Sequence, residues 1–285
     1  MADPPARRAA PVVGACSWSL KPRSPHDLAD KLRWCGVDAV QLALDPLRAG
    51  WDVGQTADVL AAAGIELRSG MLAFAGEDYS TPQSIRETGG IGPDAHWPRN
   101  LAAAREVARL AWRLRLPLVT FHAGFLPERR DDPRRAVLLE RLRAVVDAFA
   151  EADVAVGLET GQERVETLLE ALSDLARPTA GVNFDPANLL LYGMGEPVSA
   201  LAALLPYVRQ VHVKDARRPA RPGEWGAELP VGDGEVDWEA FFATLDRKGS
   251  RVDLMIEREA GDDRVGDIRR ARDLVCARLA AGAAR

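Results

Sequence analysis

The chain has 285 residues, of which 47% are hydrophobic and 28% charged, and its formal net charge is −5. This composition is typical of a globular protein with a large buried core. The negative charge excludes a global attraction to nucleic acid or to an anionic membrane, so neither is expected as a partner. The three cysteines are an odd number without CxxC spacing, which argues against a disulfide framework and favours a cytoplasmic protein.

The first residues, 1–11, contain arginine and proline but no apolar run of signal-peptide length, and we expect them to form a mobile tail. No apolar segment of transmembrane length occurs anywhere in the sequence, so no membrane span is expected. No linker divides the remaining residues, 12–285, and we expect them to form one domain.

Short runs rich in Val, Ile and Leu recur along the chain and alternate with helix-like stretches such as 27–35, 95–115, 134–152 and 162–175. This alternation predicts parallel strands joined by crossover helices, and eight units in 285 residues match a single (β/α)₈ TIM barrel. A doubly wound open sheet is the alternative, but no Gly-rich phosphate loop follows the first run. The eight runs are 12–20, 38–44, 65–74, 118–122, 154–159, 180–185, 208–214 and 252–257.

Two connections between the predicted strands are unusually long, 75–97 and 215–237, and the second contains a Gly-Asp-Gly turn at 232–234. In a barrel both connections would lie on the C-terminal face, where active sites form. Loops of this length act as lids or binding loops, or they are unstructured surface insertions.

The later apolar runs all end in a polar side chain that catalytic or metal sites use. Parallel strands place these ends at one barrel mouth, and alternation along a strand gives residues two apart the same face. If His212 points inward, Gln210 and Lys214 therefore point inward as well. The strand-end residues are His122, Glu159, Asp185, His212 and Glu257.

Three carboxylates at one mouth repel one another, and a divalent cation removes that repulsion. Glu159, Asp185 and Glu257 offer oxygen ligands, and His212 offers a nitrogen. Carboxylate-rich sites suit Mn²⁺ or Mg²⁺, and the imidazole also admits Co²⁺, Fe²⁺ or Zn²⁺. We therefore expect one divalent metal ion, with Mn²⁺ as the first candidate.

Five segments in this order and spacing carry a family resemblance: 157–161 (GLETG), 183–188 (NFDPAN), 211–215 (VHVKD), 232–238 (GDGEVDW) and 256–257 (IE). Over residues 12–275 the sequence resembles the xylose isomerase-like barrel superfamily. That superfamily includes sugar and sugar-phosphate isomerases and epimerases, inosose dehydratases and endonuclease IV.

The resemblance implies that Glu159, Asp185, His212 and Glu257 are metal ligands and that Glu159 and Glu257 are also the catalytic acid/base pair. The implied activity is a divalent-metal-dependent sugar or sugar-phosphate isomerase/epimerase acting on a small carbohydrate. Such an enzyme removes a proton α to a carbonyl, and the metal stabilises the resulting enediolate. Proton return to the same carbon gives epimerisation, and return to the neighbouring carbon gives isomerisation. Relatives are often dimers or tetramers, which leaves a homo-oligomer open.

Three other activities are compatible with this fold. A lyase or dehydratase could use the same site on a keto-sugar or keto-inositol. A sugar-binding barrel without catalysis is a further alternative, although two glutamates argue against it. An AP endonuclease like endonuclease IV needs three zinc ions and more histidines than the four present here, and Asn188 stands where that family has a histidine.

Residues around the strand ends are candidates for contact with substrate. Trp18 follows the first run and can stack on a sugar face. Gln41 stands where many relatives carry glutamate, which removes a charged substrate contact. The full set is Trp18, Gln41, His122, Asn188, Lys214 and Asp215.

Several of these candidates also have a structural interpretation. His122 is either a substrate ligand or a hydrogen-bonded structural histidine. Lys214 either holds a substrate group or forms a salt bridge at the rim, and Asn188 either orients Asp185 or caps a helix. Trp18, like other tryptophans, is commonly a core residue.

Overall fold

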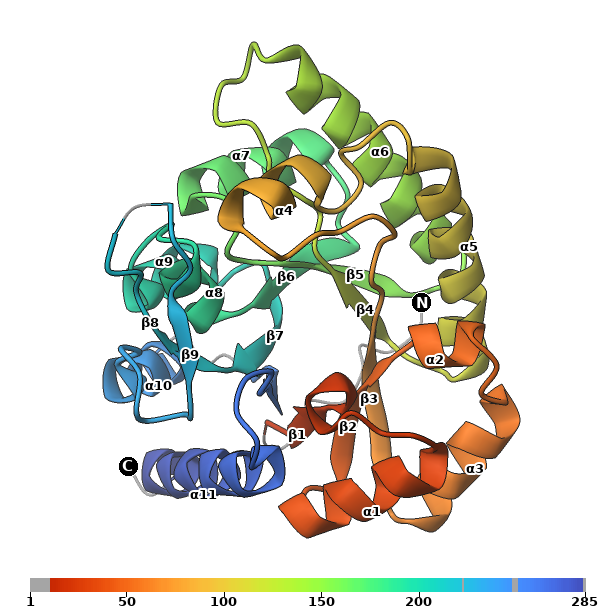
Figure 1. Cartoon of the computed structure of the whole chain (residues 1–285), viewed down its shortest axis with the longest axis vertical. Coiled ribbons are helices and arrows are strands. Elements are labelled where there is room, and N and C mark those ends of the chain that lie inside the picture. The colour runs from red at the N-terminus through yellow and green to blue at the C-terminus, as the bar shows by residue number, and fades with distance from the viewer. Residues whose placement is uncertain (1–10, 222, 248–250, 284–285) are drawn as a thin grey trace, which may run out of the picture.

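The computed structural model describes residues 11–221, 223–247 and 251–283 (Figure 1). Eight parallel strands close into a barrel in the order β1-β10-β7-β6-β5-β4-β3-β2, which confirms the predicted (β/α)₈ barrel. The tail predicted at 1–11 lies outside the described residues except for Pro11. The barrel strands are β1 (Val13–Cys16), β2 (Ala39–Ala43), β3 (Glu66–Met71), β4 (Leu118–Phe121), β5 (Ala155–Glu159), β6 (Ala180–Phe184), β7 (Val208–Val213) and β10 (Asp253–Ile256).

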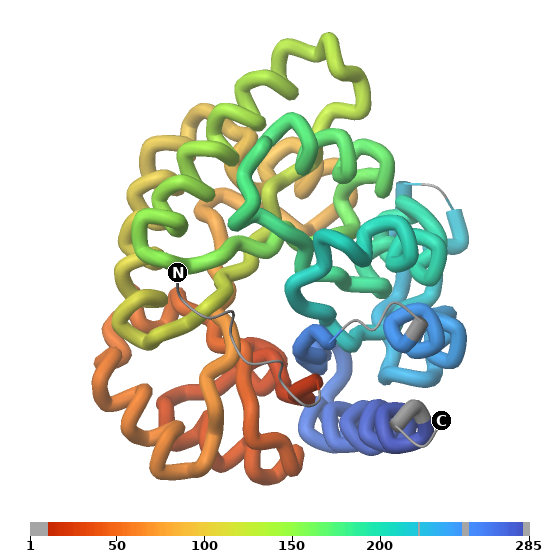
Figure 2. The backbone as a smooth tube through the Cα atoms, turned by 180° about the vertical axis from the view of Figure 1, so that it is seen from behind, coloured from red at the N-terminus to blue at the C-terminus, as the bar shows by residue number. Residues whose placement is uncertain are grey.

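Helices form the outer layer around the strands, as the view from behind shows (Figure 2). The barrel closes where β1 pairs with β10, and there α1 packs against α11. No helix in the described part of the chain is long and apolar enough to cross a membrane. The outer helices are α1 (Pro25–Cys35), α3 (Val53–Ala62), α5 (Trp97–Arg113), α6 (Pro133–Ala150), α7 (Val165–Leu175), α9 (Pro197–Leu204), α10 (Trp238–Arg247) and α11 (Arg264–Ala283).

Capping residues in the sequence determine where these helices begin and end, as α1 shows. The hydroxyl of Ser24 accepts a hydrogen bond from the backbone N–H of Asp27, and Pro25 occupies the first turn of α1. The same helix ends at Gly36, whose φ of 72° is costly for a residue with a Cβ. Small and apolar residues of α5, among them Ala104, Val107 and Ala111, face the barrel and are buried.

Several short elements lie at the barrel mouth. They are η1 (Ser17–Leu20), α2 (Asp45–Arg48), α4 (Pro82–Thr88), α8 (Pro186–Leu191) and the hairpin of β8 (Asp215–Arg217) and β9 (Ala227–Leu229). The two long connections therefore contain a helix and an antiparallel hairpin, so neither is an unstructured insertion. The first predicted strand was too long, because β1 ends at Cys16 and Trp18 lies in the 3₁₀ turn η1.

Candidate metal centre and active site

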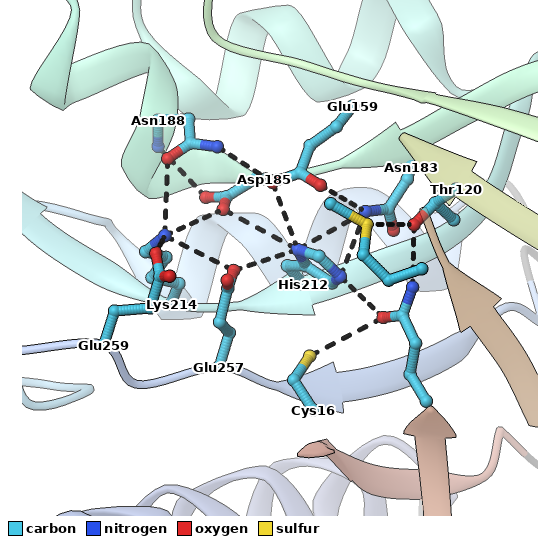
Figure 3. Close-up of polar contacts among 12 residues, drawn as sticks. Cys16, Thr120, Glu159, Asn183, Asp185, Asn188, His212, Lys214, Glu257 and Glu259 are labelled. Atoms are coloured by element: carbon cyan, nitrogen blue, oxygen red, sulfur yellow. Dashed lines mark hydrogen bonds and ion pairs between the residues drawn. The ribbon is translucent and has the colours of Figure 1, made fainter. Parts of the chain in front are cut away.

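Four residues converge at the carboxyl ends of neighbouring strands. Glu159 ends β5, Asp185 follows β6, His212 lies near the end of β7, and Glu257 follows β10. Each offers one ligand atom, and these atoms all lie within 4.8 Å of one another (Figure 3). Among the described residues this is the group that has the composition of a metal centre.

The imidazole lies at the centre of the group. Nδ1 of His212 is 3.0 Å from Glu257 Oε2, 3.5 Å from Glu159 Oε1 and 3.8 Å from Asp185 Oδ2. All four side chains are buried, with at most 4% of any residue exposed. Oδ2 of Asp185 and Oε2 of Glu257 accept no hydrogen bond from the described residues. Buried carboxylate oxygens without donors are costly, and a divalent cation among them would remove that cost, so the donor set fits such an ion.

Neighbouring side chains fix the orientation of both glutamates. The amide of Asn188 donates a 3.0 Å hydrogen bond to Glu159 Oε1, and the amide of Asn183 donates a 3.3 Å bond to Glu159 Oε2. The indole Nε1–H of Trp18 donates a 2.7 Å bond to Glu257 Oε1. Each carboxylate is therefore held from outside the group.

Positively charged side chains offset the negative charge of the buried carboxylates. Burial opposes ionisation of Glu159, but the charges of His122, His212 and Lys214 outweigh it and lower the pKa of this carboxyl. Burial alone would lower the pKa of His212, yet the surrounding negative groups raise it well above its usual value. The same competition raises the pKa of Lys214.

The side chain of Lys214 points into the barrel, as predicted, and lies among the candidate metal ligands. Its Nζ donates to Glu259 Oε2 at 2.9 Å and lies 3.4 Å from Glu257 Oε2 and 3.8 Å from Asp185 Oδ2. The residue is only 3% exposed. The lysine thus forms the salt bridge that we considered, and it does so within reach of the candidate metal ligands.

His122 lies on the other side of Glu159, with Nε2 3.4 Å from Glu159 Oε1. Its Nδ1 is buried and has no hydrogen-bond partner among the described residues, which leaves a polar atom available to a ligand. The ring of Tyr79 lies edge-on to His122, with centroids 6.4 Å apart. Tyr79 belongs to the long connection after β3, and no periodic pattern in the sequence pointed to it.

Two further aromatic contacts border the mouth. The ring of Tyr192 packs against Phe125 at 5.8 Å and against Trp225 at 5.0 Å. Tyr192 and Phe125 were not identified from the sequence, because aromatic residues in connections give no sign of which neighbours they meet. Trp225 comes from the long connection after β7, which therefore contributes to the border of the mouth.

Asp215, a candidate for substrate contact, instead holds the connection that follows it. Its carboxylate accepts five hydrogen bonds, from the backbone N–H groups of 216, 232, 234 and 236 and from the indole of Trp238. A Cβ at Gly234 would lie 2.0 Å from Asp215 Oδ1, so the second glycine of the Gly-Asp-Gly turn permits this close approach. These contacts favour a loop-holding role for Asp215 over a substrate contact.

Gln41 and Trp18 also have protein partners. Both polar atoms of the Gln41 side chain are engaged inside the barrel, which gives no support to a substrate contact. The indole of Trp18 binds Glu257, and its ring centroid lies 5.9 Å from that of His212. The backbone N–H of Asn188 donates to Asp185 Oδ1, so Asn188 helps to orient Asp185, and Asp185 rather than Asn188 caps α8. The side-chain amide of Asn188 binds Glu159.

A closed parallel barrel with a buried carboxylate–histidine group at the carboxyl ends of its strands defines a TIM-barrel protein with a candidate metal site. Residues 29–277 match the family described as xylose isomerase-like TIM barrel, and the chain belongs to that family. This membership confirms the resemblance found in the sequence.

Solved structures agree with this assignment. A xylose isomerase domain protein from Planctomyces limnophilus is 30% identical, with a TM-score of 0.86 over 97% of this chain and 99% of that one. A xylose isomerase-like TIM barrel protein from Mycobacterium smegmatis, solved in complex with magnesium, is 20% identical, with a TM-score of 0.72 over 96% and 98% of the two chains. The second similarity concerns the fold alone.

Among curated proteins, L-ribulose-5-phosphate 3-epimerase UlaE of Salmonella paratyphi C is 28% identical over 159 residues. The match covers 54% of each chain, so the chain spans about half the length of the curated relatives it matches. This partial match is to an enzyme of the sugar epimerase kind.

Proposed function

We propose that this protein is a divalent-metal-dependent sugar or sugar-phosphate isomerase or epimerase that transfers a proton at a carbon next to a carbonyl. The observation that carries the proposal is the pairing of Glu159 and Glu257 across one buried group. They come from β5 and β10, which are separated in the barrel by β6 and β7. Two carboxylates that approach a ligand from different sides provide an acid and a base for one carbon.

Glu159, Asp185, His212 and Glu257 would hold the cation. Three carboxylates and one imidazole suit Mn²⁺ best, and Mg²⁺, Co²⁺, Fe²⁺ and Zn²⁺ remain in the range of such a set. The magnesium complex of the mycobacterial relative supports a divalent ion in this kind of barrel. When bound, the ion would act as a Lewis acid that polarises a carbonyl and the neighbouring hydroxyl of the substrate.

The protein's own residues would then move the proton. One glutamate removes the proton from the carbon next to the carbonyl, and the other returns a proton to the opposite face of that carbon or to the neighbouring carbon. The first outcome is epimerisation and the second isomerisation. The hydrogen bonds from Asn188 to Glu159 and from Trp18 to Glu257 hold the two carboxylates in place for this transfer.

Polar and aromatic groups around the carboxylates suit a small carbohydrate. Nδ1 of His122, which has no hydrogen-bond partner in the described part of the chain, and the ammonium of Lys214 can each hold a substrate oxygen. Tyr192 and Trp225 provide apolar ring faces at the border, as sugar sites commonly do. The similarity to an epimerase of a phosphorylated ketose supports this class of substrate.

Solvent deuterium exchange tests the proposal. The protein with Mn²⁺ is incubated in D₂O with ketoses, keto-sugars, keto-inositols and their phosphates, and the products are followed by NMR. We expect deuterium at a carbon next to the carbonyl, together with an epimer or isomer, and loss of exchange in Glu257→Gln. Exchange that leads to elimination would instead identify a lyase. Exchange that persists unchanged in Glu257→Gln would contradict the acid/base assignment.

A further inference from the structure

Beneath the candidate metal centre, the barrel interior contains a closed set of polar side chains. Each of its members is at most 1% exposed. TIM-barrel interiors are usually filled by branched apolar residues, and buried polar groups are costly unless they are hydrogen-bonded, so this set needs a reason. Its members are Gln41 of β2, Ser69 of β3, Thr120 of β4, Asn183 of β6 and Gln210 of β7.

The amide of Gln41 has one orientation that satisfies its neighbours. Its Nε2–H donates to Thr120 Oγ1 at 2.7 Å and to the carbonyl oxygen of Gly70 at 3.4 Å. Its Oε1 accepts from Gln210 Nε2 at 2.8 Å and lies 3.6 Å from the thiol of Cys16. If the amide were flipped, its oxygen would face the carbonyl oxygen of Gly70, and its N–H would face the N–H of Gln210. The Gln41 oxygen must therefore point toward Gln210.

That same Oε1 lies 2.7 Å from Nε2 of His212. A hydrogen bond to an acceptor requires that Nε2 carry a proton. In the neutral imidazole, the form that binds a metal, a proton on Nε2 leaves the lone pair on Nδ1, on the other side of the ring. Nδ1 is the nitrogen that faces the three carboxylates, 3.0 Å from Glu257 Oε2. The side chain of Gln41 therefore selects the tautomer of His212 that can bind a metal.

The amide of Asn183 does not compete for this hydrogen bond. Its Nδ2 lies 3.0 Å from Nε2 and 3.3 Å from Nδ1 of His212. An atom nearly equidistant from both ring nitrogens cannot lie in the ring plane without colliding with the carbon between them, so it lies against the ring face. The in-plane direction of Nε2 remains open to Gln41.

We propose that Gln41 is a positioning residue for the metal centre: it accepts the Nε2–H of His212 and thereby presents Nδ1 to the cation. This inference rests on the proposed metal-dependent function. It also gives a reason for glutamine at this position. The amide accepts from His212 and donates to Thr120 at once, and it adds no fourth carboxylate beside Glu159, Asp185 and Glu257.

Metal binding and the His212 tautomer test the role of Gln41 directly. Gln41→Met keeps the volume but removes the acceptor, whereas Gln41→Glu restores an acceptor oxygen. Ser69→Ala is the matched control, because Ser69 binds Gln210 and belongs to the same buried set. Mn²⁺ affinity is measured by titration calorimetry, side-chain ¹⁵N NMR of the Zn²⁺-loaded protein reports which nitrogen of His212 carries the proton, and circular dichroism verifies folding.

We expect Gln41→Met to bind Mn²⁺ roughly 10- to 100-fold more weakly than the wild type, the range found when the partner of a ligating histidine is removed. Gln41→Glu should recover most of this loss, Ser69→Ala should bind like the wild type, and wild-type His212 should carry its proton on Nε2. Equal affinity of Gln41→Met and the wild type, or a proton on Nδ1, would overturn the role of Gln41 alone. Failure of the wild type to bind any of the candidate ions would overturn the metal centre itself.

Discussion

The indole Nε1–H of Trp18 donates a 2.7 Å hydrogen bond to Oε1 of Glu257. Trp18 follows β1 and Glu257 follows β10, the two strands whose pairing closes the barrel. The closure of the barrel therefore also fixes one of the two proposed acid/base carboxylates. The other oxygen of Glu257 faces His212 and Lys214 and accepts no hydrogen bond from the described residues.

Removal of this hydrogen bond should slow proton transfer. Trp18→Phe keeps an aromatic ring but removes the indole N–H, so Glu257 loses a donor worth about 1.5–3 kcal/mol, or roughly 10- to 100-fold in rate if the bond acts in the transition state. We expect kcat for deuterium exchange to fall within that range. Trp112→Phe, at an exposed position of α5, is the control and should be unchanged. Equal rates for Trp18→Phe and the wild type would contradict a positioning role for the indole.

Loss of a proposed ligand should lower metal occupancy without unfolding the barrel. Glu159→Gln weakens an oxygen donor and His212→Ala removes the nitrogen donor, so both variants should contain less metal after purification and lack exchange activity. Elemental analysis gives the metal content, and circular dichroism verifies the fold. Glu259→Gln, whose carboxylate binds Lys214 but lies outside the four-residue group, should keep its metal. Full occupancy in both ligand variants would refute the ligand assignment.

Asp215 lies at the rim of the barrel, yet its carboxylate should contribute substantially to the free energy of unfolding. Its five hydrogen bonds include three from backbone N–H groups of 232–236, and Asp215→Ala leaves these donors, of which that of Val236 is buried, without their acceptor. We expect a loss of about 3–5 kcal/mol in the free energy of unfolding, measured with guanidinium chloride. Asp233→Ala, which removes an exposed ion pair with Arg270, should cost less than about 1 kcal/mol. Similar losses in the two variants would show that the carboxylate does not hold the connection.

The sequence was sufficient to predict the barrel and the four-residue group because both depend on local regularities. Apolar runs alternate with helical patterns, and the carboxyl ends of parallel strands meet at one mouth of a barrel, so Glu159 and Glu257 could be placed at the same mouth. Their pairing as acid and base was implied by the family resemblance. Gln210 was correctly expected to point inward from the alternation along β7. Such regularities hold wherever one face of an element is buried.

Contacts that form only when the barrel closes could not be predicted from the sequence. The hydrogen bond between Gln41 and His212 joins residues 171 positions apart across the interior, and no periodicity encodes it. Trp18 was placed at a strand end because its run is apolar, yet the chain turns into η1 after Cys16. Asp215 was assigned to substrate for its nearness to His212 in sequence, whereas β8 turns its side chain into the following connection. In each case, tertiary contacts decide which partner a polar side chain meets.

Glu163 should give the stability of the protein a pH dependence of its own. This carboxyl is 7% exposed, and burial raises its pKa to about 8 from an ordinary value of 4.5. Between these two pH values the unfolded chain has lost the proton while the folded chain still holds it, so folding stability declines as pH rises through this window and levels off above about 8. Glu163→Gln removes the titrating group and should make the protein more stable than the wild type at pH 8.5.

Guanidinium chloride unfolding at pH 5, 6.5 and 8.5 measures this effect. Because one pKa unit corresponds to about 1.4 kcal/mol, the advantage of Glu163→Gln over the wild type should grow by a few kcal/mol across the series. Glu166→Gln, at an exposed position in the first turn of α7, serves as the control and should follow the wild-type pH dependence. A constant difference between Glu163→Gln and the wild type at all three pH values would mean that Glu163 titrates normally in the folded protein.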